Sequence, residues 1–144
     1  MALALSVEDL LGGKNVLPAK PRTPLQWVSL IRQGIPSAAV DSLATTLAIS
    51  QAELATALAI PDRTLTRRKK EGTLNSEESA KLLRLARVVK RADEVFGAIE
   101  LALDWLKSPN AALSGTTPLS LLDTDIGTES VLDTLGRIEY GVFA

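Results

Sequence analysis

Apolar residues recur along this chain at spacings of three and four, the periodicity that places side chains on one face of an α-helix. Nowhere do apolar and polar residues alternate over the length of a strand, and the β-branched and aromatic runs typical of strands are missing. The clearest helical set runs almost to the last residue and comprises Val131, Leu135, Ile138 and Val142. The pattern therefore predicts an all-α protein.

Start and stop signals divide this pattern into separate helices. Thr23 is a candidate N-cap, Pro24 suits the first position of the helix that follows, and Gly34 suits its end. Ser50 and Glu53 have the spacing of a capping box, in which each side chain accepts from the other residue's backbone N–H. The short helices predicted from these signals cover residues 23–34, 36–48, 50–60 and 61–71.

The longest helical stretch begins near Ser76 and carries a sustained apolar seam. Gly97 either kinks this helix or divides it in two. A seam of this length serves either the protein's own core or a dimer interface, and the sequence leaves both open. The seam consists of Leu85, Val89, Ala92, Phe96, Ile99, Leu103 and Leu106.

Five cations lie within eight positions of the segment PDRTLTRRKKEG, residues 61–72. Leu65 is the only large apolar side chain of this helix, so it must face the core. Arg63, Arg67 and Lys70 then lie opposite Leu65, at i, i+4 and i+7. Cations this crowded repel one another unless an anion meets them, which favours a polyanionic partner over a merely solvated basic helix.

The basic helix follows a capped, alanine-rich helix after a tight break at Ile60 and Pro61, and two short helices joined in this way predict a helix-turn-helix. Its second helix enters the major groove, where Arg reads guanine edges, Thr contacts bases or phosphates, and Lys pairs with phosphates. The residues predicted to bind DNA are Arg63, Thr64, Thr66, Arg67, Arg68, Lys69 and Lys70.

Charge is segregated along the chain. Residues 1–92 hold 14 basic and 8 acidic side chains, a net of +6, whereas residues 93–144 hold 2 basic and 9 acidic side chains, a net of −7. Phosphate would repel the acidic part, so it cannot be the DNA-binding face. The asymmetry predicts that the two parts meet different partners.

Composition narrows the chemistry. The chain of 144 residues has neither Cys nor His, which excludes disulfides, Cys- and His-based metal sites and His acid–base catalysis. No carboxylate constellation replaces them, so a small helical enzyme is disfavoured and we expect no enzymatic activity, no metal and no cofactor. The first residues lack a basic signal-peptide region and no apolar stretch reaches the length of a membrane span. We therefore expect a soluble cytoplasmic protein without a membrane partner.

These signals together predict three segments. Residues 1–22, rich in Gly, Pro and Lys near their end, form a flexible arm that serves as a minor-groove finger, a regulatory tail, an alternative partner contact or a disordered extension. Residues 23–75 form the helix-turn-helix bundle, and residues 76–144 form a C-terminal helical domain. The chain ends with Tyr140, Val142 and Phe143, and an apolar terminus either docks on its own domain or inserts into a partner.

The C-terminal residues 92–144 resemble the toxin-binding domain of Xre/MbcA/ParS-type antitoxins. The resemblance lies in VFG, in A..WL..PN.AL.G.TPL.LL.T..G and in the terminal L.RIEYGV.A, which occur here in that order. Residues 26–75 are similar to the Xre-like helix-turn-helix of the same proteins, and the arm before residue 23 lies outside the resemblance.

The resemblance implies an antitoxin of a type II toxin–antitoxin system, acting on a RES-domain toxin that degrades NAD⁺. Such antitoxins cover the toxin's active-site entrance with their C-terminal segment and repress their own operon by binding operator DNA, and a homodimer is expected because single helix-turn-helix modules bind short half-sites weakly. The alternative is a homodimeric transcriptional regulator without a toxin. The implied toxin-binding residues are Arg137, Glu139, Tyr140, Gly141, Val142, Phe143 and Ala144.

Overall fold

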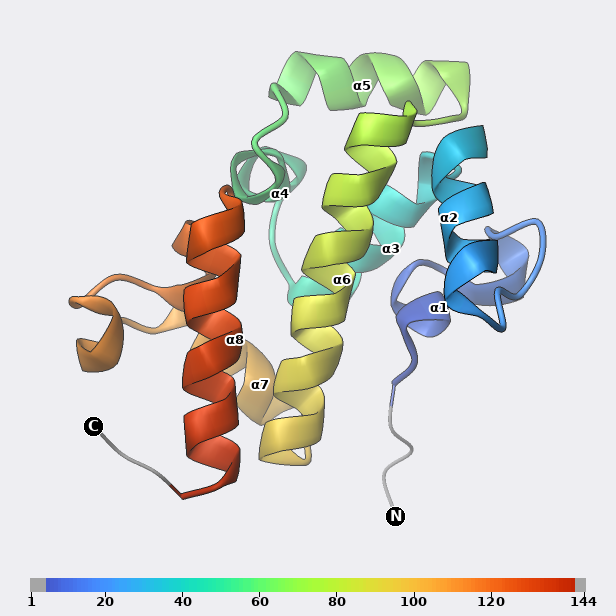
Figure 1. Ribbon diagram of the computed structural model, residues 1–144. Helices are drawn as coiled ribbons and strands as arrows, with labels where there is room; N and C mark the ends of the chain where they lie inside the picture. Colours follow the sequence, from blue (N-terminus) through green and yellow to red (C-terminus); the bar gives the residue numbers. More distant parts are fainter. Residues whose placement is uncertain (1–4, 142–144) are drawn as a thin grey trace. The chain divides into compact units, whose positions relative to one another are not determined.

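The computed structural model describes residues 5–141 and is all-α, as predicted. Figure 1 shows the helices in chain order, and within residues 5–141 the only β-type pairings are two isolated bridges. The α-helices are α1 (Val7–Leu10), α2 (Pro24–Gln33), α3 (Ala38–Leu47), α4 (Gln51–Leu58), α5 (Asp62–Glu71), α6 (Ser76–Phe96), α7 (Ile99–Lys107) and α8 (Asp125–Glu139). Three short 3₁₀ turns are η1 (Gly13–Asn15), η2 (Ala111–Leu113) and η3 (Pro118–Leu121).

The chain divides into two compact units. One comprises Ser6–Ala86, and the other comprises Arg87 onward together with Leu5. The first half of α6 belongs to the first unit because its buried polar side chains bind there. Ser79 accepts the backbone N–H of Ile35 at 2.8 Å.

The predicted caps are present at the ends of the short helices. The Thr23 side chain accepts the Gln26 N–H at 3.2 Å, and Pro24 opens α2. Ser50 and Glu53 form the reciprocal capping box at the start of α4. Each cap satisfies a backbone donor that would otherwise be left without a partner in the first helical turn.

Two backbone hydrogen bonds join the α2–α3 connection to the α5–α6 connection in the first unit. The Leu74 N–H donates to the Ile35 carbonyl at 2.9 Å, and the Ser37 N–H donates to the Gly72 carbonyl at 3.0 Å. Gly34, at φ 99°, ends α2 here, and a Cβ on it would overlap the Leu74 carbonyl oxygen. Glycine is therefore required by both the backbone angle and the close approach.

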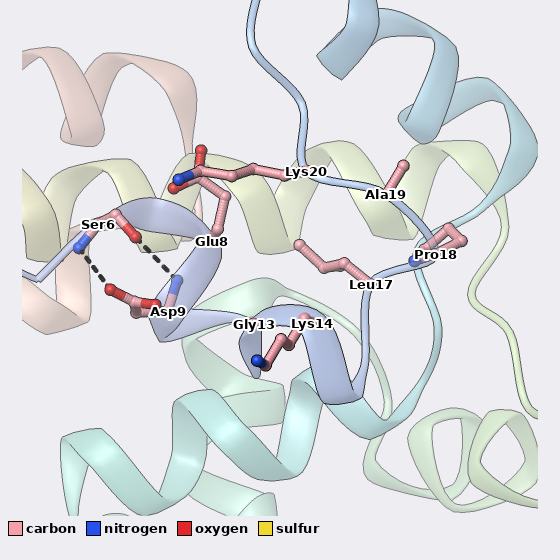
Figure 2. Close-up of a pocket in the computed structure, with 9 residues that line it drawn as sticks. All are labelled: Ser6, Glu8, Asp9, Gly13, Lys14, Leu17, Pro18, Ala19 and Lys20. Carbon is pink, nitrogen blue, oxygen red and sulfur yellow. Dashed lines mark hydrogen bonds between the residues drawn. The ribbon is translucent and has the colours of Figure 1, made fainter.

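The beginning of the chain differs from the predicted flexible arm. Leu10, Leu11 and Leu17 are buried, and α1 packs against α3. The signal was a second capping box at Ser6 and Asp9, whose reciprocal hydrogen bonds of 3.1 and 3.4 Å are drawn in Figure 2. Three buried leucines contribute more than the flexibility expected from the Gly and Pro residues, so residues 6–17 form part of the first unit.

A hollow of about 530 Å³ lies beside this packed segment (Figure 2). Its lining mixes two carboxylates, Glu8 and Asp9, with two ammonium groups, Lys14 and Lys20. Because the lining carries both signs of charge, it selects neither an anionic nor a cationic ligand. The hollow therefore does not indicate a class of ligand.

Gly97 divides the long helical stretch into α6 and α7. It has φ 76°, and the chain reverses so that the rings of Phe96 and Trp105 lie 5.7 Å apart. The seam residues Leu85, Val89 and Ala92 are buried within the single chain. These three residues therefore serve the protein's own core, the first of the two alternatives left open by the sequence.

The second unit is built on the close approach of α8 to the turn that precedes it. Val131 and Leu135 are buried, as the C-terminal periodicity predicts. At the start of α8, Thr124 caps the helix by accepting the Gly127 N–H at 2.9 Å. A Cβ on Gly127 would overlap the carbonyl oxygen of Leu121 in η3. The first turn of α8 thus packs directly on the backbone of η3.

A bidentate ion pair joins α6 to the last residue of α8. Arg91 of α6 donates from Nη1 and Nη2 to the two carboxylate oxygens of Glu139, at 2.9 and 2.7 Å. The hydrogen bond from Arg91 lowers the pKa of Glu139 below its usual value of 4.5, and the same bond raises the pKa of Arg91. Fork-to-fork geometry fixes orientation as well as distance, so the pair ties the last turn of α8 to α6.

No helix among residues 5–141 combines the length and the apolar character needed to cross a membrane.

We predict that Gly127→Ala destabilises the protein by about 1–3 kcal/mol, the cost of forcing a methyl group into a packed contact. Gly136→Ala is the matched control, because Gly136 lies in the same helix and a Cβ there would meet nothing within 4 Å. The control should be neutral or stabilising by up to about 1 kcal/mol. Urea unfolding measures both variants, and equal stabilities would contradict the close approach of α8 to η3.

The Arg91–Glu139 pair should give the stability a defined pH dependence. Because the folded-state pKa of Glu139 is lowered, its contribution is fully present above pH 4.5 and is lost as pH falls through the folded-state pKa. The difference in unfolding free energy between the wild type and Glu139→Gln should therefore be constant near neutrality and should shrink below pH 4.5. Urea titrations at a series of pH values measure it, and a difference that does not change with pH would count against the pair.

Candidate functional site

The helix pair α4–α5 has the short, tight connection expected of a helix-turn-helix. Ala59 ends α4 in the left-handed conformation at φ 55°, Ile60 is buried, and Pro61 leads directly into α5. Leu65 is the buried residue of α5, as predicted. A helix attached through one leucine leaves most of its circumference open to solvent.

Five of the predicted DNA-binding residues are exposed on α5, namely Arg63, Thr66, Arg67, Lys69 and Lys70. Arg63, Arg67 and Lys70 lie on the side away from Leu65, and Thr66 lies on one flank of that side. Arg67 is 3.4 Å from the exposed Glu71 one turn along the helix. Thr64 is half-buried on the opposite flank. The exposed set combines two guanidiniums, two ammonium groups and one hydroxyl, which is a set of donors suited to an anionic or acceptor-rich surface.

Arg68 was predicted as a DNA contact, and its side chain is instead engaged within the protein. Its Nε donates to Glu78 at 2.8 Å, and its Nη1 donates to Glu71 at 3.0 Å. Both hydrogen bonds raise the pKa of Arg68, and the bond to Glu78 has the larger effect. The Glu78 side chain is only 9% exposed, so Arg68 supplies the charge that a buried carboxylate needs.

Lys69 is likewise held within the first unit. Its Nζ lies 2.8 Å from Asp41 in α3 and donates to the Gln51 Oε1 at 2.9 Å. Gln51 also donates from Nε2 to Asp62 and to Thr66, at 2.8 and 3.0 Å. Sequence reasoning missed Gln51. The only signal is its place directly after the N-cap of α4, where a side chain can reach the helix that follows.

The end of α8 carries the described part of the implied toxin-binding set. Arg137 is exposed, Glu139 is held by Arg91, and Gly141 follows the helix at φ 71°. Tyr140 is 80% exposed, so it is not docked on its own domain. The remaining members of the set, Val142, Phe143 and Ala144, lie outside the described residues.

A hollow of about 440 Å³ lies beside Arg137, between α8 and the loop that carries η2. Hydroxyl groups dominate its polar lining, and Asp133 adds a carboxylate from the next turn of α8. Further acidic residues of α7 and α8 are exposed. They include Glu100, Asp104 and Glu129.

Two family models match successive parts of the chain. Residues 26–87 match the antitoxin Xre-like helix-turn-helix domain, which includes α4 and α5. Residues 91–141 match the antitoxin Xre/MbcA/ParS C-terminal toxin-binding domain, which begins at Arg91 and includes all of α8. The helix-turn-helix predicted from the sequence is thus confirmed.

Individual relatives agree with these matches. The chain is 38% identical over 130 residues to antitoxin Xre from Yersinia enterocolitica, covering 89% of this chain and 86% of the relative. It is 27% identical over 132 residues to a protein named Prs ADP-ribosylating antitoxin from Sphingobium sp., covering 85% of this chain and 83% of the relative.

A solved structure has the same fold. A chain of the crystal structure of the M. tuberculosis MbcT–MbcA toxin–antitoxin complex aligns with a TM-score of 0.57 and 23% identity, covering 75% of this chain and 96% of that chain. With both domain models matched in order and a relative sharing 38% of its residues over nearly the whole length, this chain belongs to the Xre/MbcA/ParS family of antitoxins.

Proposed function

We propose that this chain neutralises a RES-type, NAD⁺-degrading toxin by covering the toxin's active site with its C-terminal segment, and that it binds operator DNA through α5 to repress its own operon. The single observation that carries the toxin half is the exposure of Tyr140 at the end of a helix whose last turn is tied to α6 by the Arg91–Glu139 pair. An apolar ring held in solvent on a rigid support is typical of a binding anchor.

The side chains at the C-terminal end of α8 suit contact with a pocket of a partner protein. Tyr140 offers a large apolar surface with one polar atom, and Arg137 offers a planar donor to carboxylates or backbone carbonyls of the partner. The left-handed Gly141 lets the chain turn immediately after the helix. Inhibition of this kind is steric occlusion and needs no catalytic residue of the antitoxin.

The identity of the toxin is the finer part of the proposal. A relative from Sphingobium is named for ADP-ribosylation, a reaction in which NAD⁺ donates the ADP-ribosyl group. Small-molecule sites are concave clefts, so a segment that covers the entrance of an NAD⁺ site is enough to block it.

The DNA half rests on the exposed face of α5. Arg63, Arg67 and Lys70 are exposed on one side of a helix that follows a tight turn, the arrangement in which a recognition helix enters the major groove. We further propose that the chain binds as a homodimer, because two-fold pairing joins two half-sites. Light scattering at micromolar concentration tests this, and a monomeric mass would oppose it.

For the toxin, we predict that deletion of residues 140–144 abolishes neutralisation while leaving the fold intact. The deletion retains Glu139 and hence its ion pair with Arg91, so thermal unfolding should be unchanged. The measurement is growth of cells that co-express the truncated chain with the toxin gene next to its own gene. Full protection by the truncated chain would contradict insertion of the terminus.

Tyr140→Ala is the point variant of the same test and should weaken toxin binding by about 2 kcal/mol or more, as for a buried aromatic anchor. Leu25→Ala is its matched control, since Leu25 is a similarly exposed apolar residue at 77% but belongs to α2. Toxin affinity of the control should equal that of the wild type. If the neighbouring gene encodes no toxin, the chain acts as a regulator alone.

For DNA, we predict that the triple variant Arg63/Arg67/Lys70→Ala loses binding to a duplex covering the sequence upstream of the chain's own gene. Arg67→Ala alone should cost about 1–3 kcal/mol at that site if Arg67 reads a base, whereas Lys70→Ala should weaken binding to every sequence alike. Fluorescence anisotropy at fixed salt measures these affinities.

The control removes the same charge elsewhere: Arg32/Arg87/Lys107→Ala also deletes three exposed cations but leaves α5 untouched. Its affinity for the upstream duplex should fall far less. Equal losses of affinity in the two triple variants would show that only the net charge of the protein matters for binding. Unchanged affinity of the α5 variant would exclude this helix as the DNA contact.

A further inference from the structure

The side chain of Gln51 forms a hydrogen-bonded bracket between α4 and α5. Its Nε2 donates to the Asp62 Oδ1 at 2.8 Å and to the Thr66 Oγ1 at 3.0 Å, and its Oε1 accepts from the Lys69 Nζ at 2.9 Å. Asp62, Thr66 and Lys69 recur at i, i+4 and i+7, so they share one face of α5. A single amide therefore fixes three positions of the basic helix.

The orientation of this amide is determined by the chemistry of its neighbours. The Lys69 ammonium can only donate, so it must meet the amide oxygen, and the Asp62 carboxylate accepts, so it must meet the amide nitrogen. Exchanging the oxygen and nitrogen of Gln51 would put donor against donor and acceptor against acceptor. The group that reaches Thr66 is therefore the NH₂ group.

This contact determines what Thr66 can do. An amide NH₂ group only donates, so the Thr66 hydroxyl oxygen must accept from it, and the hydroxyl proton must point elsewhere. Other helical threonines, such as Thr56 and Thr128, donate this proton to the carbonyl four residues earlier, at 3.1 and 2.9 Å. In the part of the chain that the structure describes, no residue accepts the proton of Thr66, which is exposed beside the cationic face of α5.

We propose that Gln51 is a positioning residue that presents the Thr66 hydroxyl as a hydrogen-bond donor to a base acceptor in the major groove of DNA, an inference that rests on the proposed DNA-binding function. The acceptors available there are N7 and O6 of guanine, N7 of adenine and O4 of thymine. The amino groups of adenine and cytosine only donate, so they cannot use the Thr66 proton and have only the one lone pair of the hydroxyl oxygen that Gln51 leaves unoccupied. Without Gln51 the hydroxyl can rotate freely and both of its lone pairs are open, so the preference for base acceptors is weakened.

The test uses the duplex that the full-length protein protects upstream of its own gene, together with a scrambled duplex of the same length. Thr66→Val, which keeps the shape and removes the hydroxyl, should lower affinity for the protected duplex by roughly 5- to 10-fold, the effect of one lost hydrogen bond. Gln51→Ala should lower it in the same direction. Affinity for the scrambled duplex and the dependence on salt should not change, since no phosphate contact is removed.

The double variant Gln51→Ala/Thr66→Val should bind no more weakly than Thr66→Val alone, because Gln51 acts through Thr66. Thr66→Ser retains the hydroxyl and should bind within twofold of the wild type. Thermal unfolding of each variant provides the check on folding, and if Gln51→Ala is unstable, Thr66→Val and Thr66→Ser still decide the role of the hydroxyl.

Three results would overturn the inference: wild-type affinity of Thr66→Val for the protected duplex, equal losses on both duplexes, which would make Thr66 a phosphate contact, or a double variant whose loss is the product of the two single losses. If Arg63/Arg67/Lys70→Ala abolishes binding while Thr66→Val does not weaken it, only this inference fails. If no duplex is protected, or the triple variant binds as the wild type does, the proposed DNA-binding function fails with it.

Discussion

The attachment of α5 through charged and polar side chains is the constraint on which the proposed DNA-binding surface of this protein depends. A helix that presents cations to a partner cannot also bury a wide apolar face, and α5 buries Leu65 alone. Its two flanks are therefore held by hydrogen-bonded ion pairs, Arg68 to Glu78 on one side and Lys69 to Asp41 on the other. Two of the five cations are thereby consumed in holding the helix, and the remainder face outward.

The C-terminal unit also uses an ion pair to hold a helix, here α8, which leads to the proposed toxin-binding residues. A segment that is to enter a partner's cleft must be exposed and yet held in one direction, because an unrestrained tail loses more entropy on binding. The bidentate pair between Arg91 and Glu139 holds the last turn of α8, and Tyr140 follows it at once into solvent. In both units, an arginine or lysine paired with a carboxylate holds the helix that carries the proposed binding residues.

The sequence predicted the elements of the fold well, because caps and apolar periodicity are local signals. Thr23, Ser50, Leu65 and Gly97 act in the structure as their sequence contexts indicate. The roles of individual site residues were harder to predict, because they depend on partners distant in the chain. Glu139 meets Arg91 across 48 positions. The burial of Leu10, Leu11 and Leu17 was missed since Gly and Pro marked the segment as flexible, whereas α1 packs against α3.

The central claim is that one chain meets two partners through two separate surfaces. Amide hydrogen exchange of the full-length protein, measured alone, with the upstream duplex and with the neighbouring toxin, tests it most directly. The account predicts that DNA slows exchange across residues 61–72 and leaves residues 137–141 unchanged, while toxin does the reverse. Protection of the same residues by both partners, or of neither segment by either partner, would contradict it.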